Sequence, residues 1–468
     1  MNIHDYFMKI TVTIFLSFLL IFILSFNSYS LTAGVAKGVI TPDISREPIG
    51  VFGNKMDKVG RDIYARVLVL NDGSQRVVVV TYDLNCLDVA TPILRERLKK
   101  ELSIPVENFI PLATHNHCAP IQIVPENFEY GRWLAEKIYQ LIQEAIDHEI
   151  GQVSLEFGFG YVYHLFSLGN APVDYEVQVL KVVKDDGNPV AILFNHPTHP
   201  LHIKGQNNVI DTGHFGYAIK YVEEAFPDTM VLFADACGGN QFTKNMMHAP
   251  MSVVQRYGKE LANEVIRIAK NKQKSIDGNI ISSFQVIPLS LNKPIPFEDV
   301  QRLSFFYPTD IGYIHYPAPE RDTNWVRSLF KHYKEKIPFP QKTSDMICTD
   351  DEFLIENNPD GREFSCRFEE SIVVKIGELI FVALQGEVCA PIGMRIKDAF
   401  RYEHPIMLFG YMGEHNLYIP TREIVRLDIY QARVIQEQYA SPVKWSPTVE
   451  DEMVSAVQSQ IKDILRKK

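Results

Sequence analysis

The sequence has few cysteines, no excess of positive charge and only one long apolar run, and each of these absences excludes a class of protein. Six cysteines in 468 residues are too few for a disulfide scaffold. A formal net charge of −10 disfavours nucleic acid and anionic membrane surfaces as electrostatic partners. The sequence also lacks internal repeats and low-complexity linkers. Its 46% hydrophobic and 22% charged content is typical of an ordinary globular protein.

The single long apolar run lies at the N-terminus and predicts an export signal. It extends from Ile10 to Phe26 and is followed by the small-residue pattern Ser28-Tyr29-Ser30. This order is that of a secretory signal peptide, residues 1–30, with cleavage after Ser30. We therefore expect a protein exported to the periplasm or the extracellular space. The alternative is an uncleaved N-terminal anchor, because a membrane-spanning helix needs about 20 apolar residues.

Short apolar strands and amphipathic helices alternate along the rest of the chain. We expect strands at 66–72, 76–84, 108–114 and 229–236, helices at 130–150 and 213–226, and a hairpin at Asp186-Gly187-Asn188-Pro189. This alternation predicts an α/β fold of mixed β-sheets layered with helices, forming a single large catalytic domain over residues 31–468. The Pro-rich and aromatic stretch 293–342 is less regular and is expected to be a lid or a surface excursion.

The cysteines divide into two groups. Cys348 and Cys366 flank a polar loop, where they either form a disulfide or remain free. The other four lie in apolar stretches and are expected to be buried free thiols: Cys86, Cys118, Cys237 and Cys389.

The stretch ATHNHCAP, residues 113–120, places two histidines directly after an apolar strand. If the segment is extended, His115 and His117 point to the same side, which is a geometry suited to metal binding. Two histidines at a strand end are also common as polar surface residues at the edge of a sheet, or as buried residues whose ring nitrogens form hydrogen bonds. The interpretation as a metal site is supported only if other candidate ligand residues lie close to this pair.

Three more strand ends carry side chains that can bind a metal. They are AILFNHPTHPLHI, with His196, His199 and His202; LIFVALQGEV, with Glu387; and IMLFGYMGEHNLYIP, with Tyr411, Glu414, His415 and Tyr418. Two histidines, a carboxylate and a water are a common ligand set of catalytic zinc. Each signal alone has a plainer interpretation, because Glu387 could cap a helix and the histidines could fill loops. Together they are harder to dismiss and make a metal-dependent hydrolase one hypothesis, beside a binding or a structural role.

Read in order, these stretches resemble the neutral, non-lysosomal ceramidase family. The similarity includes AGVAKGVITPDI near the start, ATHNHCAP, LFNHPTHP, IDTGHFGYAIKYVEEAF, LQGEVCAPIGMRI and LYIPTREIVRLDIYQA, which ends at Ala432. ATHNHCAP is similar to the family segment Thr-His-x-His-Ser-Gly/Ala-Pro. The resemblance implies the catalytic domain of that family, without the C-terminal β-sandwich that several members carry.

The resemblance also implies roles for individual residues. The zinc ligands of the family fall on His115, His196, Glu387 and Tyr418, with His199 as a nearby rival to His196. His117 matches the second histidine of the pair, which lies beside the reacting centre. Tyr430 matches the tyrosine that donates a hydrogen bond to the developing oxyanion. Zn²⁺ is the implied cofactor.

One segment departs from the family pattern. Ceramidases of the family carry a Gly-Asp-x-Ser-Pro stretch whose serine is assigned as nucleophile or as a substrate-positioning hydroxyl. The corresponding segment here is FADACGGNQFTKN, which places Asn240 at the aspartate and Phe242 at the serine. Thr243 is adjacent and could substitute if the loop shifts by one residue. A serine mechanism, and ceramide as the substrate, are therefore open to question.

We expect a zinc-dependent hydrolase of N-acyl bonds that acts on ceramide-like sphingolipids or other N-acyl lipids and makes at most transient contact with a membrane surface. Two alternatives remain open. One is a zinc hydrolase of another ester or amide, and the other is a binding protein that retains zinc without catalysis. Asp83, Asp211 and His214 are expected to cap or support local structure, or else to orient a zinc ligand.

Overall fold

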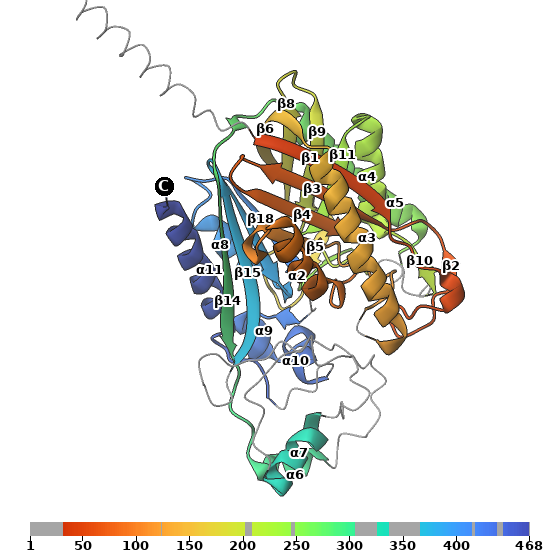
Figure 1. Cartoon of the computed structure of the whole chain (residues 1–468). Coiled ribbons are helices and arrows are strands. Elements are labelled where there is room, and N and C mark those ends of the chain that lie inside the picture. The colour runs from red at the N-terminus through yellow and green to blue at the C-terminus, as the bar shows by residue number, and fades with distance from the viewer. Residues whose placement is uncertain are drawn as a thin grey trace, which may run out of the picture.

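The structure, a computed structural model, describes residues 31–122, 124–201, 208–244, 249–304, 325–336, 366–413, 417–437 and 443–467. These residues form a 13-stranded mixed sheet, three two-stranded sheets and covering helices (Figure 1), which confirms the predicted α/β class. Within the described part, no helix combines the length and the apolar character needed to cross a membrane.

The elements have the following bounds. In the large sheet the strands lie in the order β11 (Met230–Asp235), β9 (Pro189–His196), β8 (Glu176–Lys184), β6 (Ile150–Tyr161), β1 (Leu31–Val39), β3 (Tyr64–Asn71), β4 (Arg76–Tyr82), β5 (Phe109–Ala113), β18 (Ile406–Met412), β16 (Leu379–Gln385), β15 (Cys366–Ile376) and β14 (Ile280–Ser290), with β13 (Ser275–Ile276) beside β6. The small sheets pair β10 (Val209–Ile210) with β2 (Lys58–Val59), β12 (Gln241–Thr243) with β7 (Leu165–Ser167), and β17 (Glu387–Val388) with β19 (Tyr418–Ile419). The helices are α2 (Ala90–Leu102), α3 (Phe128–Asp147), α4 (Gly213–Ala225), α5 (Met251–Lys270), α6 (Phe297–Ser304), α7 (Trp325–Glu335), α8 (Ala390–Asp398), α9 (Arg422–Leu427), α10 (Tyr430–Glu437) and α11 (Val449–Arg466).

Helices cover the outer faces of the sheet in three groups (Figure 1). Helices α2 and α3 pack on β1, β3 and β4; α4 and α5 pack on β8, β9 and β11; α8 and α11 pack on the strands at the other end of the sheet. The predicted helices at 130–150 and 213–226 are confirmed as α3 and α4, and the predicted hairpin joins β8 to β9. From the stretch 293–342, α6 and α7 pack against each other through Val300, Val326 and Leu329.

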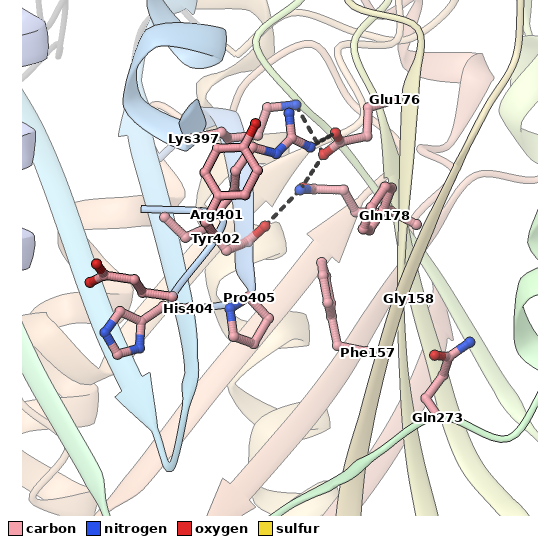
Figure 2. A pocket seen from close by; sticks show the side chains of 13 residues that line it. Phe157, Gly158, Glu176, Gln178, Gln273, Lys397, Arg401, Tyr402, His404 and Pro405 are labelled. Atoms are coloured by element: carbon pink, nitrogen blue, oxygen red, sulfur yellow. Dashed lines mark hydrogen bonds and ion pairs between the residues drawn. The ribbon is translucent and has the colours of Figure 1, made fainter. Parts of the chain in front are cut away.

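A buried polar network joins β8 to α8 and β18. The ammonium of Lys397 lies 2.7 Å from Oδ2 of Asp174 and 3.1 Å from Oε1 of Glu176. The guanidinium of Arg401 pairs with the other oxygen of Glu176, and the side-chain amide of Gln178 donates to Glu176 and to the carbonyl of Ile406. Four of these side chains, those of Glu176, Gln178, Lys397 and Arg401, line a cavity (Figure 2). The volume of this cavity is about 450 Å³. Because every charge in the network has a partner, its evident role is to hold the two halves of the sheet together.

Replacing Lys397 with methionine is expected to destabilise the protein by about 3–5 kcal/mol. The substitution leaves the buried carboxylate of Asp174 without its cationic partner, and removing one member of a buried pair costs more than the pair contributes. Denaturant unfolding followed by fluorescence measures the change. Lys274→Met is the matched control, because Lys274 pairs with Glu378 at the exposed surface and should cost no more than about 1 kcal/mol. Equal losses in the two variants would contradict the interpretation.

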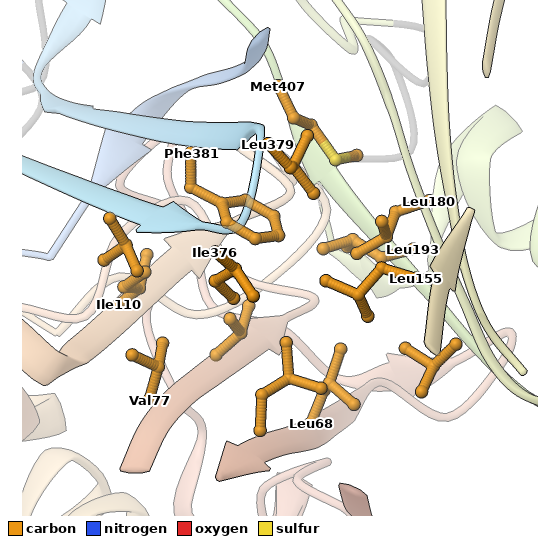
Figure 3. Packing of buried hydrophobic residues seen from close by; sticks show 14 of the residues in the cluster. Leu68, Val77, Ile110, Leu155, Leu180, Leu193, Ile376, Leu379, Phe381 and Met407 are labelled. Atoms are coloured by element: carbon orange, nitrogen blue, oxygen red, sulfur yellow. The ribbon is translucent and has the colours of Figure 1, made fainter. Parts of the chain in front are cut away.

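The large sheet bends so that its two halves face each other across an apolar core. Residues alternate between this core and the outer helices: Leu68 and Leu70 face inward, whereas Val67 and Val69 pack toward α2 and α3. Figure 3 shows Phe381 and Met407 from one half opposite Leu180 and other residues of the second half. Strands buried on both faces explain the uninterrupted valine run at 77–80, because neither face meets water.

The candidate ligands follow strands whose C-terminal ends lie at one edge of the bent sheet. The pairs β4 and β5, β9 and β11, and β16 and β18 are each parallel, so their C-terminal ends meet. Left-handed backbone follows two of these strands, at His115 (φ 53°) after β5 and Gly386 (φ 84°) after β16, and interrupts β18 at Tyr411 (φ 53°), where its register with β16 shifts. The described residues of the predicted site therefore come from one end of the fold.

Candidate metal centre

Three histidine side chains converge at this edge of the sheet. Nε2 of His115 lies 3.2 Å from Nε2 of His199 and 3.1 Å from Nε2 of His117. Their ligand atoms all lie within 4.8 Å of one another. His115 and His199 are buried, while His117 is partly exposed at the rim. The predicted convergence of the ATHNH pair with a histidine from the NHPTH segment is therefore present in the structure.

The route by which His115 and His117 come together differs from the expected one. Strand β5 ends at Ala113, and His115 has a left-handed backbone instead of continuing the extended chain. The two rings meet edge to face, with centroids 4.6 Å apart and an interplanar angle of 89°. A tight turn, and not the alternation of a strand, brings the two imidazoles together.

Glu387 and Tyr418 complete the group. Oε2 of Glu387 lies 3.2 Å from Nε2 of His115 and 3.5 Å from Nδ1 of His199. The hydroxyl of Tyr418 lies 3.4 Å from Nε2 of His199. Glu387 in β17 is the direct pairing partner of Tyr418 in β19. This parallel pairing holds the two residues side by side.

His196, the position that the resemblance predicted as a ligand, lies outside this cluster. It is the last residue of β9, and its Nδ1 faces the carbonyl of Glu176 at 3.4 Å while its ring contacts His164. The chain then turns through Pro197, and the backbone N–H of His199 donates to the carbonyl of Gln241 at 2.8 Å. This bond holds His199 beside His115. The structure therefore places the rival, His199, in the cluster and His196 outside it.

Burial keeps all three imidazoles of the cluster neutral near pH 7. It lowers the pKa of His115 to about 3, and a backbone hydrogen bond to Asn85 offsets this only in part. Burial also lowers the pKa of His117 and of His199 well below the ordinary histidine value, and the nearby His115 lowers both further. Neutral imidazoles offer the lone pairs that a metal ion requires, so the electrostatics favour metal binding.

The donor set fits a transition-metal ion such as zinc. Three nitrogen atoms that meet at 3.1–3.2 Å cannot all be satisfied by hydrogen bonds to one another, because each neutral imidazole carries one proton. Zinc binds imidazole nitrogen at about 2.0–2.1 Å, so neighbouring ligand atoms of a tetrahedral ion lie about 3.3 Å apart. Imidazole, carboxylate and phenol donors at such spacings can share one ion.

Residues around the cluster orient His115 and the loop of His199. Nδ1 of His115 faces the side-chain amide of Asn85 at 3.1 Å, and the ring of His115 stacks on Tyr411 with centroids 4.3 Å apart. Oδ1 of the buried Asp235 accepts a hydrogen bond from the backbone of Thr198 at 3.1 Å. Burial, with the nearby Glu387 carboxylate, raises the pKa of Asp235 well above its ordinary value. Sequence patterns did not single out Asn85 or Asp235.

Tyr430, the predicted oxyanion donor, lies next to Tyr418. The two rings meet at 5.7 Å with an interplanar angle of 74°, and Tyr430 is partly exposed at the first turn of α10. On the other side, the ring of Phe52 contacts His117 at 5.6 Å. Aromatic side chains therefore lie next to the cluster in two places: Phe52 is beside His117, and Tyr430 is beside Tyr418.

The segment that departs from the family pattern presents an apolar ring to the cluster. Phe242, in β12, packs on His199 with centroids 5.1 Å apart. Because side chains alternate along a strand, the neighbouring Thr243 points to the other side. Asn240 is used structurally, since its Oδ1 accepts a hydrogen bond from the backbone of Ala390 at the start of α8. Of Phe242 and Thr243, it is Phe242 whose side chain packs on His199 in the structure.

Several other predicted residues have structural roles. Asp211 pairs with Arg61 and accepts a hydrogen bond from Gly213 at the start of α4, and Asp83 pairs with Arg66. Cys86, Cys118, Cys237 and Cys389 are buried thiols, as expected, and the thiol of Cys86 donates a hydrogen bond to Asp88. Cys348, Glu414, His415 and His202 lie outside the described residues, so the pairing of Cys348 with Cys366 stays a prediction.

A comparison with protein-family models found no match, and a search of curated proteins found none either. Among solved structures, the neutral ceramidase from Pseudomonas aeruginosa is 16% identical to this chain, covers 92% of this chain and 74% of its own, and superposes with a TM-score of 0.68. A structure described as ceramidase complexed with C2 is also 16% identical, with coverage of 93% and 76% and a TM-score of 0.68. At this identity the similarity shows a shared fold, which confirms the fold that the resemblance implied.

Proposed function

We propose that this protein is a zinc-dependent hydrolase of N-acyl amide bonds, with ceramide-like lipids as its leading substrates. The observation that carries the proposal is the convergence of His115, His199, Glu387 and Tyr418 at one edge of a sheet with the neutral ceramidase fold. The signal peptide predicted at residues 1–30 supports export, so the same proposal includes activity outside the cytoplasm.

In this proposal, His115, His199, Glu387 and Tyr418 hold the metal. When bound, zinc supplies Lewis-acid activation of a water molecule and of an amide carbonyl. The protein's own contribution is to fix these four side chains, which come from four separate segments. Asn85 and Tyr411 fix the ring of His115, and the backbone bond from His199 to Gln241 fixes the second imidazole.

His117 is assigned as the proton acceptor. Its Nε2 points into the cluster, its imidazole is neutral, and it is the one histidine of the three that reaches the rim. Nε2 takes a proton from the attacking water and later delivers it to the leaving amine. This route requires no serine, which agrees with the presence of Phe242 where the family has one.

Tyr430→Phe is expected to lower kcat by about 10²–10³-fold while metal content stays unchanged. The hydroxyl of Tyr430 is assigned to the oxyanion that forms on the acyl carbon, a contact that is stronger in the transition state than in the ground state. Steady-state kinetics on an N-acyl substrate measures the loss. Tyr402→Phe is the control, because Tyr402 is 94% exposed. An unchanged kcat in the Tyr430 variant would remove this residue from the mechanism.

Phe242 favours a second candidate, a hydrolase whose substrate differs from ceramide. An apolar ring against His199 removes a hydroxyl that would otherwise contact the substrate head group. A panel of short- and long-chain ceramides, N-acyl amino acids and matched acyl esters separates the candidates. Fastest turnover of ceramides supports the first proposal, and preference for another N-acyl compound or an ester supports the second. Binding of the panel without turnover, with zinc bound, would indicate a non-catalytic binding protein.

A further inference from the structure

A second group of histidines lies on the side of β9 that faces α4 and α5. It consists of His164, His196 and His214, which we call the second histidine group. The rings of His164 and His196 are perpendicular, with centroids 5.6 Å apart, and the rings of His164 and His214 are 6.5 Å apart. All three side chains are buried, with relative exposures of 6%, 0% and 0%. None of them belongs to the cluster around His115.

Two of these imidazoles are held in the orientation that metal ligands adopt. Nδ1 of His164 lies 3.0 Å from a carboxylate oxygen of Glu260, and Nδ1 of His196 lies 3.4 Å from the carbonyl oxygen of Glu176. Both acceptors require the proton to be on Nδ1, so the lone pair of each ring is on Nε2. A carboxylate or carbonyl behind Nδ1 is the usual support of a metal-binding histidine.

The two Nε2 atoms are buried and have no hydrogen-bond partner among the described residues. Leaving two acceptors unsatisfied in the interior costs about 1–3 kcal/mol each, so a shared binding partner is expected. Two imidazoles on one tetrahedral zinc have ring centroids about 5–6 Å apart, given nitrogen–zinc distances of about 2.0–2.1 Å. The 5.6 Å separation of His164 and His196 fits that arrangement.

We propose that His164 and His196 bind a second transition-metal ion, with His214 as the third imidazole beside it. The ligand class is a borderline metal such as zinc, because neutral imidazoles select such ions over calcium or magnesium. This site is separate from the proposed catalytic centre and does not depend on the proposed function.

An access path to the second site is present. His164 lines a cavity of about 650 Å³ between the end of β6 and α5, together with Tyr163, Tyr257 and Glu260. Tyr163 at its rim is 65% exposed, so the cavity opens to solvent. A metal ion can therefore reach the second histidine group without passing through the cluster around His115.

Metal stoichiometry tests the proposal. Protein saturated with zinc and freed of excess metal by gel filtration is expected to hold two zinc ions per chain by mass spectrometry of the metal content. His196→Ala and, as a second variant, His164→Ala are each expected to hold one, as is His115→Ala. His148→Ala is the control, because His148 is exposed on the C-terminal turn of α3, and it should hold two.

One zinc ion per chain in the wild type, unchanged in folded His196→Ala and His164→Ala, would overturn the proposal. Circular dichroism verifies that each variant is folded. Failure of the catalytic centre is recognised separately, because it would leave the zinc content of His115→Ala equal to that of the wild type.

Discussion

Replacing His115 with alanine is expected to remove one bound zinc ion per chain and to abolish N-acyl hydrolysis in the same variant. His115 is the centre of the cluster, since its Nε2 lies within 3.2 Å of a nitrogen or oxygen atom of His117, His199 and Glu387. Removing it separates the remaining donors and leaves a cavity where a fully buried ring was stacked on Tyr411. We expect activity to fall by at least about 10³-fold, to the level of metal-free protein.

The comparison needs a control for general damage. His148→Ala alters an exposed histidine and is expected to retain wild-type zinc content and kcat. A thermal melt of each variant separates loss of metal from loss of fold. Full activity in a folded His115→Ala protein would contradict the assignment of this cluster as the catalytic centre.

Replacing His117 with alanine is expected to separate metal binding from catalysis. If His117 is the proton acceptor, the variant keeps its zinc and loses about 10²–10⁴-fold in kcat, the usual contribution of a general base. We expect zinc content and kcat to respond differently because of where the residues lie. His117 lies at the rim of the cluster, while His115, His199, Glu387 and Tyr418 are all buried. Metal content and single-turnover kinetics on the same preparation give both quantities.

Zinc content in the His117 variant also decides its role. Loss of zinc to the extent seen in His115→Ala would show that His117 is a ligand, and the proton acceptor would then have to be sought elsewhere. Retained zinc with unchanged kcat would exclude both roles. Small-molecule imidazole added to the His117→Ala protein offers a further check, because a missing general base is open to rescue and a misplaced ligand is not.

The candidate site residues at the strand ends were predictable from the sequence, because a polar residue that follows an apolar run stands out in the local pattern. His115, Glu387 and Tyr418 each follow such a run, and the structure brings all three together. The α/β class was predictable for the same reason, since apolar periodicity shows directly which segments are strands and which are helices. Helices α3 and α4 begin and end within a few residues of the expected positions.

The remaining features depend on contacts that no local pattern encodes. The resemblance favoured His196 over its rival His199 in NHPTHP, whereas the hydrogen bond that holds His199 beside His115 is made to Gln241, a residue far along the chain. The left-handed turn at His115 is likewise invisible in ATHNH. The bend of the sheet depends on contacts between distant strands, such as that of Asn195 with Leu408, which are set by the whole fold.

Asn85 illustrates a functional residue that carries no signal of its own. It lies in the loop after β4, and its amide reaches Nδ1 of His115 because β4 and β5 are parallel neighbours. Asp235 is similar, since the parallel pairing of β11 with β9 places it beside the loop that carries His199. Residues that support ligands become visible only when the strand order is known.

The most direct test of the central claim is acyl release from a short-chain ceramide by the protein from residue 31 onward, measured before and after zinc removal by a chelator and again after zinc is restored. The account predicts turnover that disappears with the metal, returns with zinc and is absent in His115→Ala. Hydrolysis that continues unchanged in protein shown to be free of metal, or that persists in His115→Ala, would contradict it.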